Sequence, residues 1–94
     1  PDASGDLTRA IEAIERALTL NPRNVIACYQ GADVSEQLAR WRQEHGQDPE
    51  PDLERALALY RRGRDINPKL PQLHNGLGAA LLWQDLVEAA RKEG

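Results

Sequence analysis

The stretch that decides the fold reads DLERALALYRRGRDINP, from Asp52 to Pro68. An earlier stretch, DLTRAIEAIERALTLNP from Asp6 to Pro22, follows the same plan. Both open with Asp-Leu-x-x-Ala, carry an arginine at the fourth position and close with Asn-Pro. A repeated helical unit of this kind cannot bury its own apolar stripe, so it must stack on a neighbouring unit. The repeat therefore predicts an all-α stack of helices.

Working outward from the two repeats, apolar periodicity and breaker residues predict about five helices. Their ranges are 6–20, 25–45, 50–66, 71–84 and 85–93. The first three carry apolar or small residues at spacings of three and four, which predicts their buried stripes. In chain order these are Leu7, Ala10, Ile11, Ile14, Ala17 and Leu18; Ala27, Gly31, Val34, Leu38, Trp41 and His45; and Leu53, Ala56, Leu57, Tyr60 and Gly63.

Two local features sharpen these boundaries. Asp48 is expected to cap the third helix, with Pro49 at its first helical position. Gly76 and Gly78 each cost about 1 kcal/mol relative to alanine in a helix interior. We expect another helix to approach closely at both glycines.

Composition narrows the functional classes. The chain has 94 residues and a net charge of −3, without the basic stripe of a dedicated nucleic-acid binder. Its longest apolar run, around Gly78 to Trp83, is too short to span a membrane. The single cysteine, Cys28, excludes an internal disulfide and favours a cytoplasmic location. Because the sequence contains no methionine, we interpret it as one domain, residues 1–94, from a longer protein.

These repeats resemble the tetratricopeptide family. The segment from Gly5 to Asn24 is similar to its outer helix, and Leu77-Gly78 followed by Leu81 is similar to its inner helix. The resemblance implies a right-handed α-solenoid of antiparallel helix pairs. The distance from Asp52 to Asp85 is 33 residues, close to the family period of about 34. From Asp6 to Asp52 it is 46, so we expect one lengthened inner helix.

The resemblance implies a protein–protein interaction module that holds a peptide or a domain in the concave groove of its inner helices. Lengthened units of this sort are also similar to repeat regions attached to bacterial serine/threonine kinases, which would make the chain a regulatory segment. A structural role in oligomerisation, with a second copy of the chain as partner, is the other alternative. Neither a nucleic acid nor a membrane is an expected partner.

By register, the resemblance assigns partner contacts to one exposed side of the second and fourth helices. Aromatic side chains there would anchor the interface, and amides would pair with a peptide backbone. The assigned residues are Ile26, Tyr29, Gln30, Asp33, Gln37, Gln72, Asn75, Ala79, Leu82 and Trp83. For Tyr29 and Trp83, filling helix junctions is an equally good interpretation. Trp41 either packs on the turn at Pro49–Pro51 or is open to another chain.

Residues able to carry chemistry are scattered. His45, His74 and Cys28 are far apart in the sequence and lack the spacing of a metal site. We therefore expect neither an enzyme nor a cofactor. Three arginines, Arg61, Arg62 and Arg64, crowd one helix end. They could hold a phosphate or an acidic tail, although a solvated helix end that complements the dipole is the interpretation we favour.

Overall fold

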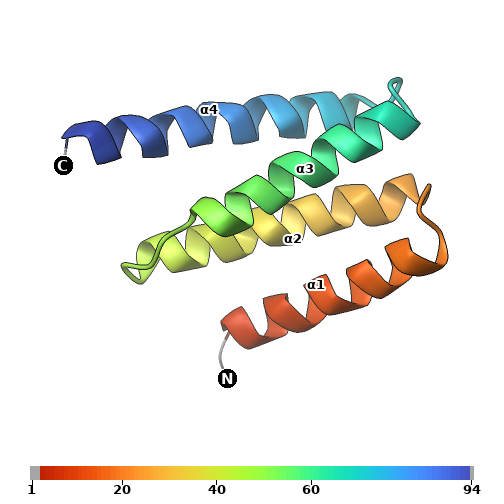
Figure 1. Ribbon diagram of the computed structural model, residues 1–94, viewed down its shortest axis with the longest axis horizontal. Coiled ribbons are helices and arrows are strands. Elements are labelled where there is room, and N and C mark those ends of the chain that lie inside the picture. Colours follow the sequence, from red (N-terminus) through yellow and green to blue (C-terminus); the bar gives the residue numbers. More distant parts are fainter. Residues whose placement is uncertain (1–2, 94) are drawn as a thin grey trace.

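The computed structural model describes residues 3–93, which form four α-helices and no strand. The helices are α1 (Ala3–Leu20), α2 (Val25–Glu44), α3 (Glu50–Ile66) and α4 (Pro71–Glu93). Each helix runs antiparallel to the one before it and packs against it, so that the four lie in sequence order across the molecule (Figure 1). The predicted all-α class and the antiparallel packing of successive helices are confirmed.

The breaker residues act as expected at the first turn and the last. Pro22 follows α1, and the side chain of Asn24 caps α2 by accepting a hydrogen bond from the Ala27 amide at 3.0 Å. Pro68 follows α3, and Pro71 opens α4, where a missing amide hydrogen costs nothing. These two turns lie at the same end of the molecule, and the α2–α3 loop lies at the other (Figure 1).

The predicted fifth helix is wrong, because α4 continues without a break to Glu93. The pattern Asp85-Leu86-x-x-Ala89, which resembled a new repeat, lies inside α4. No glycine or proline occurs between Gln84 and Glu93 to end the helix, and the buried Val87 adds this region to the core. α4, at 23 residues, is therefore longer than α2, at 20 residues.

The α2–α3 loop corrects two further predictions. α2 ends at Glu44, and His45 is an exposed C-cap residue rather than part of the packed stripe. Asp48 does not cap α3, since Pro49 occupies the N-cap position; instead the Asp48 carboxylate accepts a hydrogen bond from the Glu50 amide at 3.0 Å. A short acidic side chain readily bonds the backbone two residues on, which stabilises the turn before the helix.

The main core lies along α3, between α2 and α4. All five residues expected to be buried on α3 are buried. Gly63 allows close packing, because a Cβ there would lie 2.9 Å from Leu73 Cδ2 and 3.2 Å from Cys28 Cβ. A Cβ at Gly76 would overlap the ring of Tyr60, so the expected close approach is confirmed there. At Gly78 the expectation is wrong, since no neighbouring side chain or helix lies within 4 Å of a Cβ placed there.

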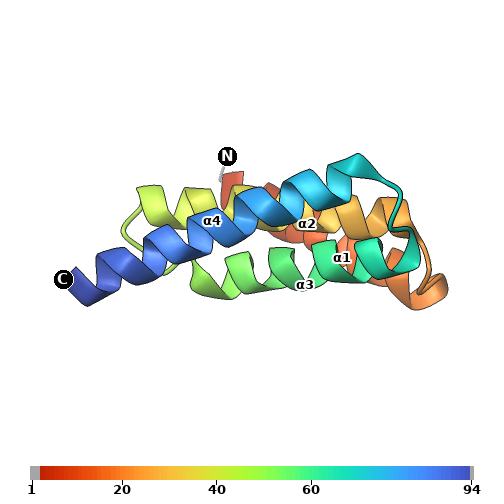
Figure 2. The same cartoon turned by 90° about the horizontal axis from the view of Figure 1, so that it is seen from above.

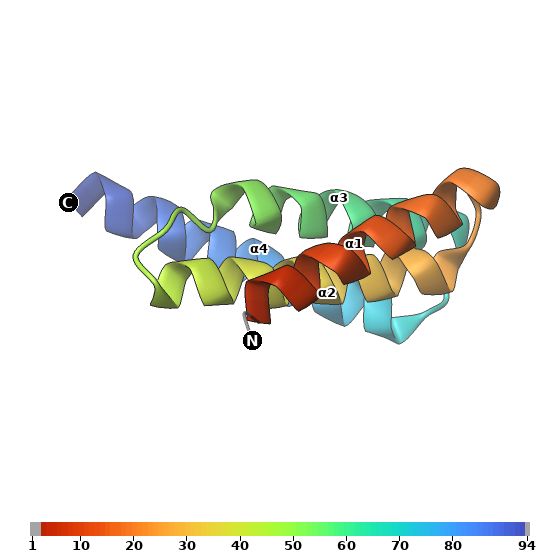
Figure 3. The same ribbon diagram turned by 90° about the horizontal axis from the view of Figure 1, so that it is seen from below.

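A smaller cluster joins α1 to the rest. Leu18 of α1 packs with Ala27 and Cys28 of α2, and Leu59 and Ile66 of α3 pack against the same cluster. Figure 3 shows α1 crossing α2 obliquely, with α3 beyond it. α1 is thus held mainly by α2, with side chains of α3 completing the contact.

Ion pairs connect the helices at the end of the molecule where the α2–α3 loop lies. The buried carboxylate of Asp52 pairs with Arg42 of α2 and, at 2.9 Å, with Arg55 of α3. Arg91, near the end of α4, pairs with Asp48 and with Glu50. The last turn of α4 is therefore tied to the α2–α3 loop.

Candidate functional site

One side of α2 is open to solvent. Ile26 is 56% exposed and Tyr29 is 37% exposed, and Gln30, Asp33 and Gln37 are exposed beside them. At 100° per residue these five side chains lie opposite the buried side of α2. Asp33 accepts a hydrogen bond from the Gln37 amide at 2.9 Å. The positions that the resemblance assigned on α2 therefore form one continuous exposed stripe.

The assigned positions on α4 divide into two groups. Gln72, Asn75 and Ala79 are exposed, and so is Leu82, at 62%. Trp83 is half-buried, with the guanidinium carbon of Arg40 of α2 at 5.5 Å from the centre of a Trp83 ring. Trp83 therefore joins the two helices, as the interpretation as a junction residue requires.

The two helices that carry these stripes lie next to each other over part of their length. Viewed from above, α2 and the first half of α4 lie on one side, whereas α3 and the end of α1 lie on the other (Figure 2). Tyr60 of α3 fills the space beneath them, because it contacts Gly76 of α4 and donates its hydroxyl to Glu36 of α2. We call this surface the α2–α4 face; it comprises Ile26, Tyr29, Gln30, Asp33, Gln37, Gln72, Asn75, Ala79 and Leu82.

The Tyr60 hydroxyl lies beneath the α2–α4 face, near polar and acidic side chains of α2. Burial raises the pKa of the Tyr60 hydroxyl well above its usual range, and the hydrogen bond to Glu36 raises it further. The nearby carboxylate of Asp33 and the hydroxyl of Tyr29 act in the same direction. Two carboxylates of α2, those of Glu36 and Asp33, therefore lie near the Tyr60 hydroxyl.

Trp41 does not belong to the α2–α4 face. It is half-buried and stacks on His45, with ring centroids 4.0 Å apart. With Leu7 of α1, it lines a shallow hollow of about 230 Å³ between α1 and the end of α2. Trp41 therefore lies on the α1 side of α2.

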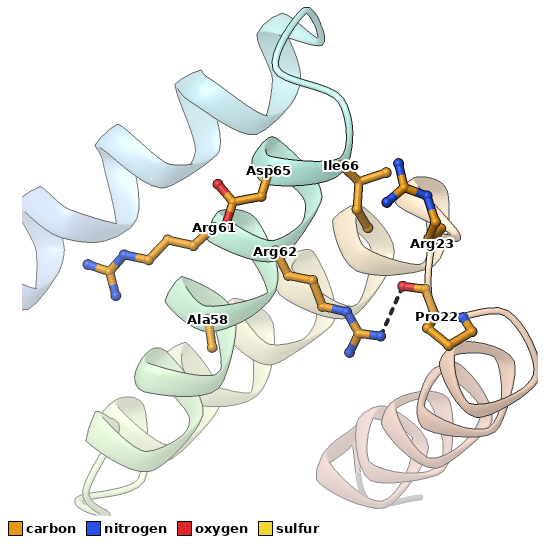
Figure 4. Close-up of a pocket in the computed structure, with 7 residues that line it drawn as sticks. All are labelled: Pro22, Arg23, Ala58, Arg61, Arg62, Asp65 and Ile66. Carbon is orange, nitrogen blue, oxygen red and sulfur yellow. Dashed lines mark hydrogen bonds between the residues drawn. The ribbon is translucent and has the colours of Figure 1, made fainter.

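A larger hollow, of about 620 Å³, lies between the α1–α2 turn and the last turns of α3 (Figure 4). Its lining contains two of the three arginines noted in the sequence, Arg61 and Arg62, together with Arg23 from the turn. Arg64 does not line it and instead approaches Asp65 at 3.9 Å. The sequence did not single out Arg23, because only the chain reversal at Pro22 brings it near α3.

The groups with reactive side chains lie on separate elements. Cys28 is fully buried, and burial raises the pKa of its thiol, an effect that Arg62 partly offsets. His45 Nδ1 lies 2.7 Å from the Trp41 carbonyl oxygen, and His74 Nε2 lies 2.6 Å from that of Pro68. Within residues 3–93, no three His, Cys, Asp or Glu side chains are grouped so as to hold a metal ion.

No helix in the described part of the chain has the length and apolar character needed to cross a membrane. Comparisons with protein-family models, with curated proteins and with solved structures found no match.

Proposed function

We propose that this chain is a protein-interaction module that binds a partner peptide or domain on the α2–α4 face. The observation that carries the proposal is the exposure of large apolar side chains there. Among the residues that the structure describes, Ile26, Tyr29 and Leu82 belong to a group of five exposed large apolar residues, with Leu20 and Leu86. Apolar side chains gathered on one surface are typical of interaction sites, and tyrosine is a frequent anchor.

The polar residues of the face suit a peptide partner. The amides of Gln72 and Asn75 are exposed on α4, and that of Gln30 is exposed on α2. Each amide offers both a donor and an acceptor to the main chain of a bound segment. Because the helices that carry them pack on a common core through Tyr60, the surface exists before the partner arrives. The free-energy cost of ordering then falls mainly on the partner.

The same proposal extends to the architecture. We propose that the helix pairs α1–α2 and α3–α4 are units of a right-handed solenoid of tetratricopeptide type. The repeated sequences of α1 and α3 and the sequential antiparallel packing support this assignment.

The test begins with a random-peptide display selection on the purified chain. Selected peptides are synthesised, and their affinities are measured for the parent chain and for the variants Tyr29→Ala and Leu82→Ala. Loss of an interface anchor costs about 2 kcal/mol, which is about thirtyfold in affinity. Leu20→Ala is the matched control, because Leu20 is 88% exposed outside the α2–α4 face. Equal affinities for all the variants, or no selected peptide, would refute the proposal.

Self-association is the alternative that one observation favours. Leu82 and Leu86 are both about 60% exposed, at 62% and 61%, and lie four residues apart on α4. Side chains four residues apart share one side of a helix, so a second copy could cover them. Sedimentation across a range of concentrations separates the two functions, since a monomer excludes self-association and a dimer disrupted by Leu86→Ala supports it.

A further inference from the structure

The hollow between the α1–α2 turn and the end of α3 combines apolar walls with arginines. Pro22, Ala58 and Ile66 supply the apolar part of its lining. Arg23, Arg61 and Arg62 supply the cations, and Asp65 is the one carboxylate in the lining. On α3 the lining residues lie opposite the buried side of the helix, so the hollow faces away from the α2–α4 face.

The arginines of this hollow differ from most others in the chain. Arg9, Arg42, Arg55, Arg64 and Arg91 each pair with a carboxylate. Among the described residues, neither Arg23 nor Arg61 has such a partner. Arg62 donates a hydrogen bond to the Pro22 carbonyl at 3.0 Å, which fixes its position without neutralising its charge. In a chain with net charge −3, uncompensated cations gather here.

The directions of these side chains indicate the size of the ligand. Figure 4 shows Arg62 directed at Pro22, whereas Arg61 extends away from it, toward α4. Arg23 projects from the α1–α2 turn, on the side of Arg62 opposite to Arg61 (Figure 4). A single small anion would contact only part of this array. A segment carrying several negative charges could contact all of it.

We propose that this hollow binds an acidic peptide segment, with carboxylates on Arg23, Arg61 and Arg62 and an apolar side chain against Ile66 and Pro22. Arginine suits this ligand because its planar guanidinium can donate two hydrogen bonds to one carboxylate. The three guanidiniums outnumber the single lining carboxylate of Asp65, so the net charge of the hollow attracts an acidic segment. The apolar lining distinguishes such a peptide from a free phosphate.

The test uses a fluorescent peptide in which glutamates alternate with leucines, with a lysine-for-glutamate version as its counterpart. The parent chain should bind only the acidic peptide, more weakly as salt increases. The double variant Arg23→Gln/Arg61→Gln should weaken binding about tenfold or more, from the loss of charge-assisted hydrogen bonds. Neither guanidinium has a hydrogen bond or ion pair within the described chain, and the backbone hydrogen bond from the Arg23 amide to Asn21 survives the substitution, so the variant should keep the parent melting temperature.

Two matched controls make the test specific. Arg16→Gln removes one positive charge, as each substitution of the double variant does, from an exposed position on α1, and Tyr29→Ala alters the α2–α4 face; both should bind the acidic peptide as the parent does. An equal loss with Arg16→Gln would overturn the proposal in favour of general charge attraction. Inorganic phosphate that displaces the peptide at stoichiometric concentration would also overturn it, because a free anion would then be the occupant. Failure of the Tyr29→Ala test on selected peptides leaves this result unaffected, so the two proposals fail separately.

Discussion

α1 and α3 share one sequence plan, but among the described residues only α3 has a helix on both sides. Leu53 and Ala56 of α3 are fully buried, whereas their counterparts Leu7 and Ala10 of α1 are only half-buried. The acid that opens each repeat differs in the same way, since Asp52 is buried and Asp6 is exposed. The local pattern thus specifies which side of a helix is apolar, and the number of neighbouring helices determines how much of that side is removed from water.

The largest test of this comparison truncates equivalent leucines. Leu53→Ala should destabilise the fold by about 3 kcal/mol, because it leaves a cavity between α2 and α4. Leu7→Ala should cost about 1 kcal/mol, since its side chain is already partly hydrated. Urea denaturation followed by circular dichroism measures both free energies of unfolding. Equal losses would contradict the comparison and show that α1 is as firmly packed as α3.

A smaller effect is expected from the acids that open the repeats. Asp52→Asn weakens the pairing with Arg42 and Arg55 in a buried position, which should cost about 1–2 kcal/mol. Asp6→Asn removes one exposed pair with Arg9 and should change stability by less than about 0.5 kcal/mol. The melting temperatures of both variants and the parent, at low and at high salt, measure these losses of stability. If Asp52→Asn has the melting temperature of the parent, the ion pairs of the buried Asp52 carboxylate do not stabilise the α2–α3 end of the molecule.

The smallest effect appears at high pH and concerns Tyr60, whose counterpart in α1 is Ile14. The unfolded chain releases the Tyr60 proton near pH 10, whereas the folded protein keeps it because burial raises the pKa. Stability from this group is therefore complete below about pH 10 and is lost as the pH rises toward the folded pKa, by at most about 1.4 kcal/mol per pH unit.

Tyr60→Phe should remove this alkaline loss, although it also loses the hydrogen bond to Glu36 at every pH. The measurement is therefore the change in melting temperature between neutral pH and about pH 11. Tyr29→Phe is the control, because Tyr29 is exposed and only adds to the raised pKa of Tyr60; it should reduce the alkaline loss by less than Tyr60→Phe does. A parent-like alkaline loss in Tyr60→Phe would show that another group causes it.

The fold was largely predictable because its signals are local. Prolines at 22, 68 and 71 placed the turns, and the stripe of α3 was correct at every position. The prediction at Asp85 is wrong because the repeat motif alone indicates a helix start there, and no glycine or proline stands directly before it to end α4. The loose packing of α1 was not predictable from its own sequence, since it reflects a missing neighbour on one side among the described residues.

The candidate surfaces were predictable to different degrees. The register of the tetratricopeptide resemblance placed Ile26 and Tyr29 on the exposed side of α2. For Trp41 the sequence offered packing on the turn at Pro49–Pro51 or contact with another chain, and it did not predict the place beside α1, because that contact depends on how two helices cross. The hollow that contains Arg23 could not be predicted from the sequence. Its residues come from a turn and from a helix about forty positions apart, as the hydrogen bond from Arg62 to the Pro22 carbonyl shows.

Because Cys28 is buried between helices, the reactivity of its thiol measures how often those helices separate. The thiol lies where α2 meets Gly63 of α3, and it is both inaccessible to solvent and held in its less nucleophilic, protonated form. An alkylating reagent can therefore reach the sulfur only when α1 or α3 separates from α2 around it. Since Cys28 is the single cysteine of the chain, the rate of its alkylation counts those separations directly, without any added label.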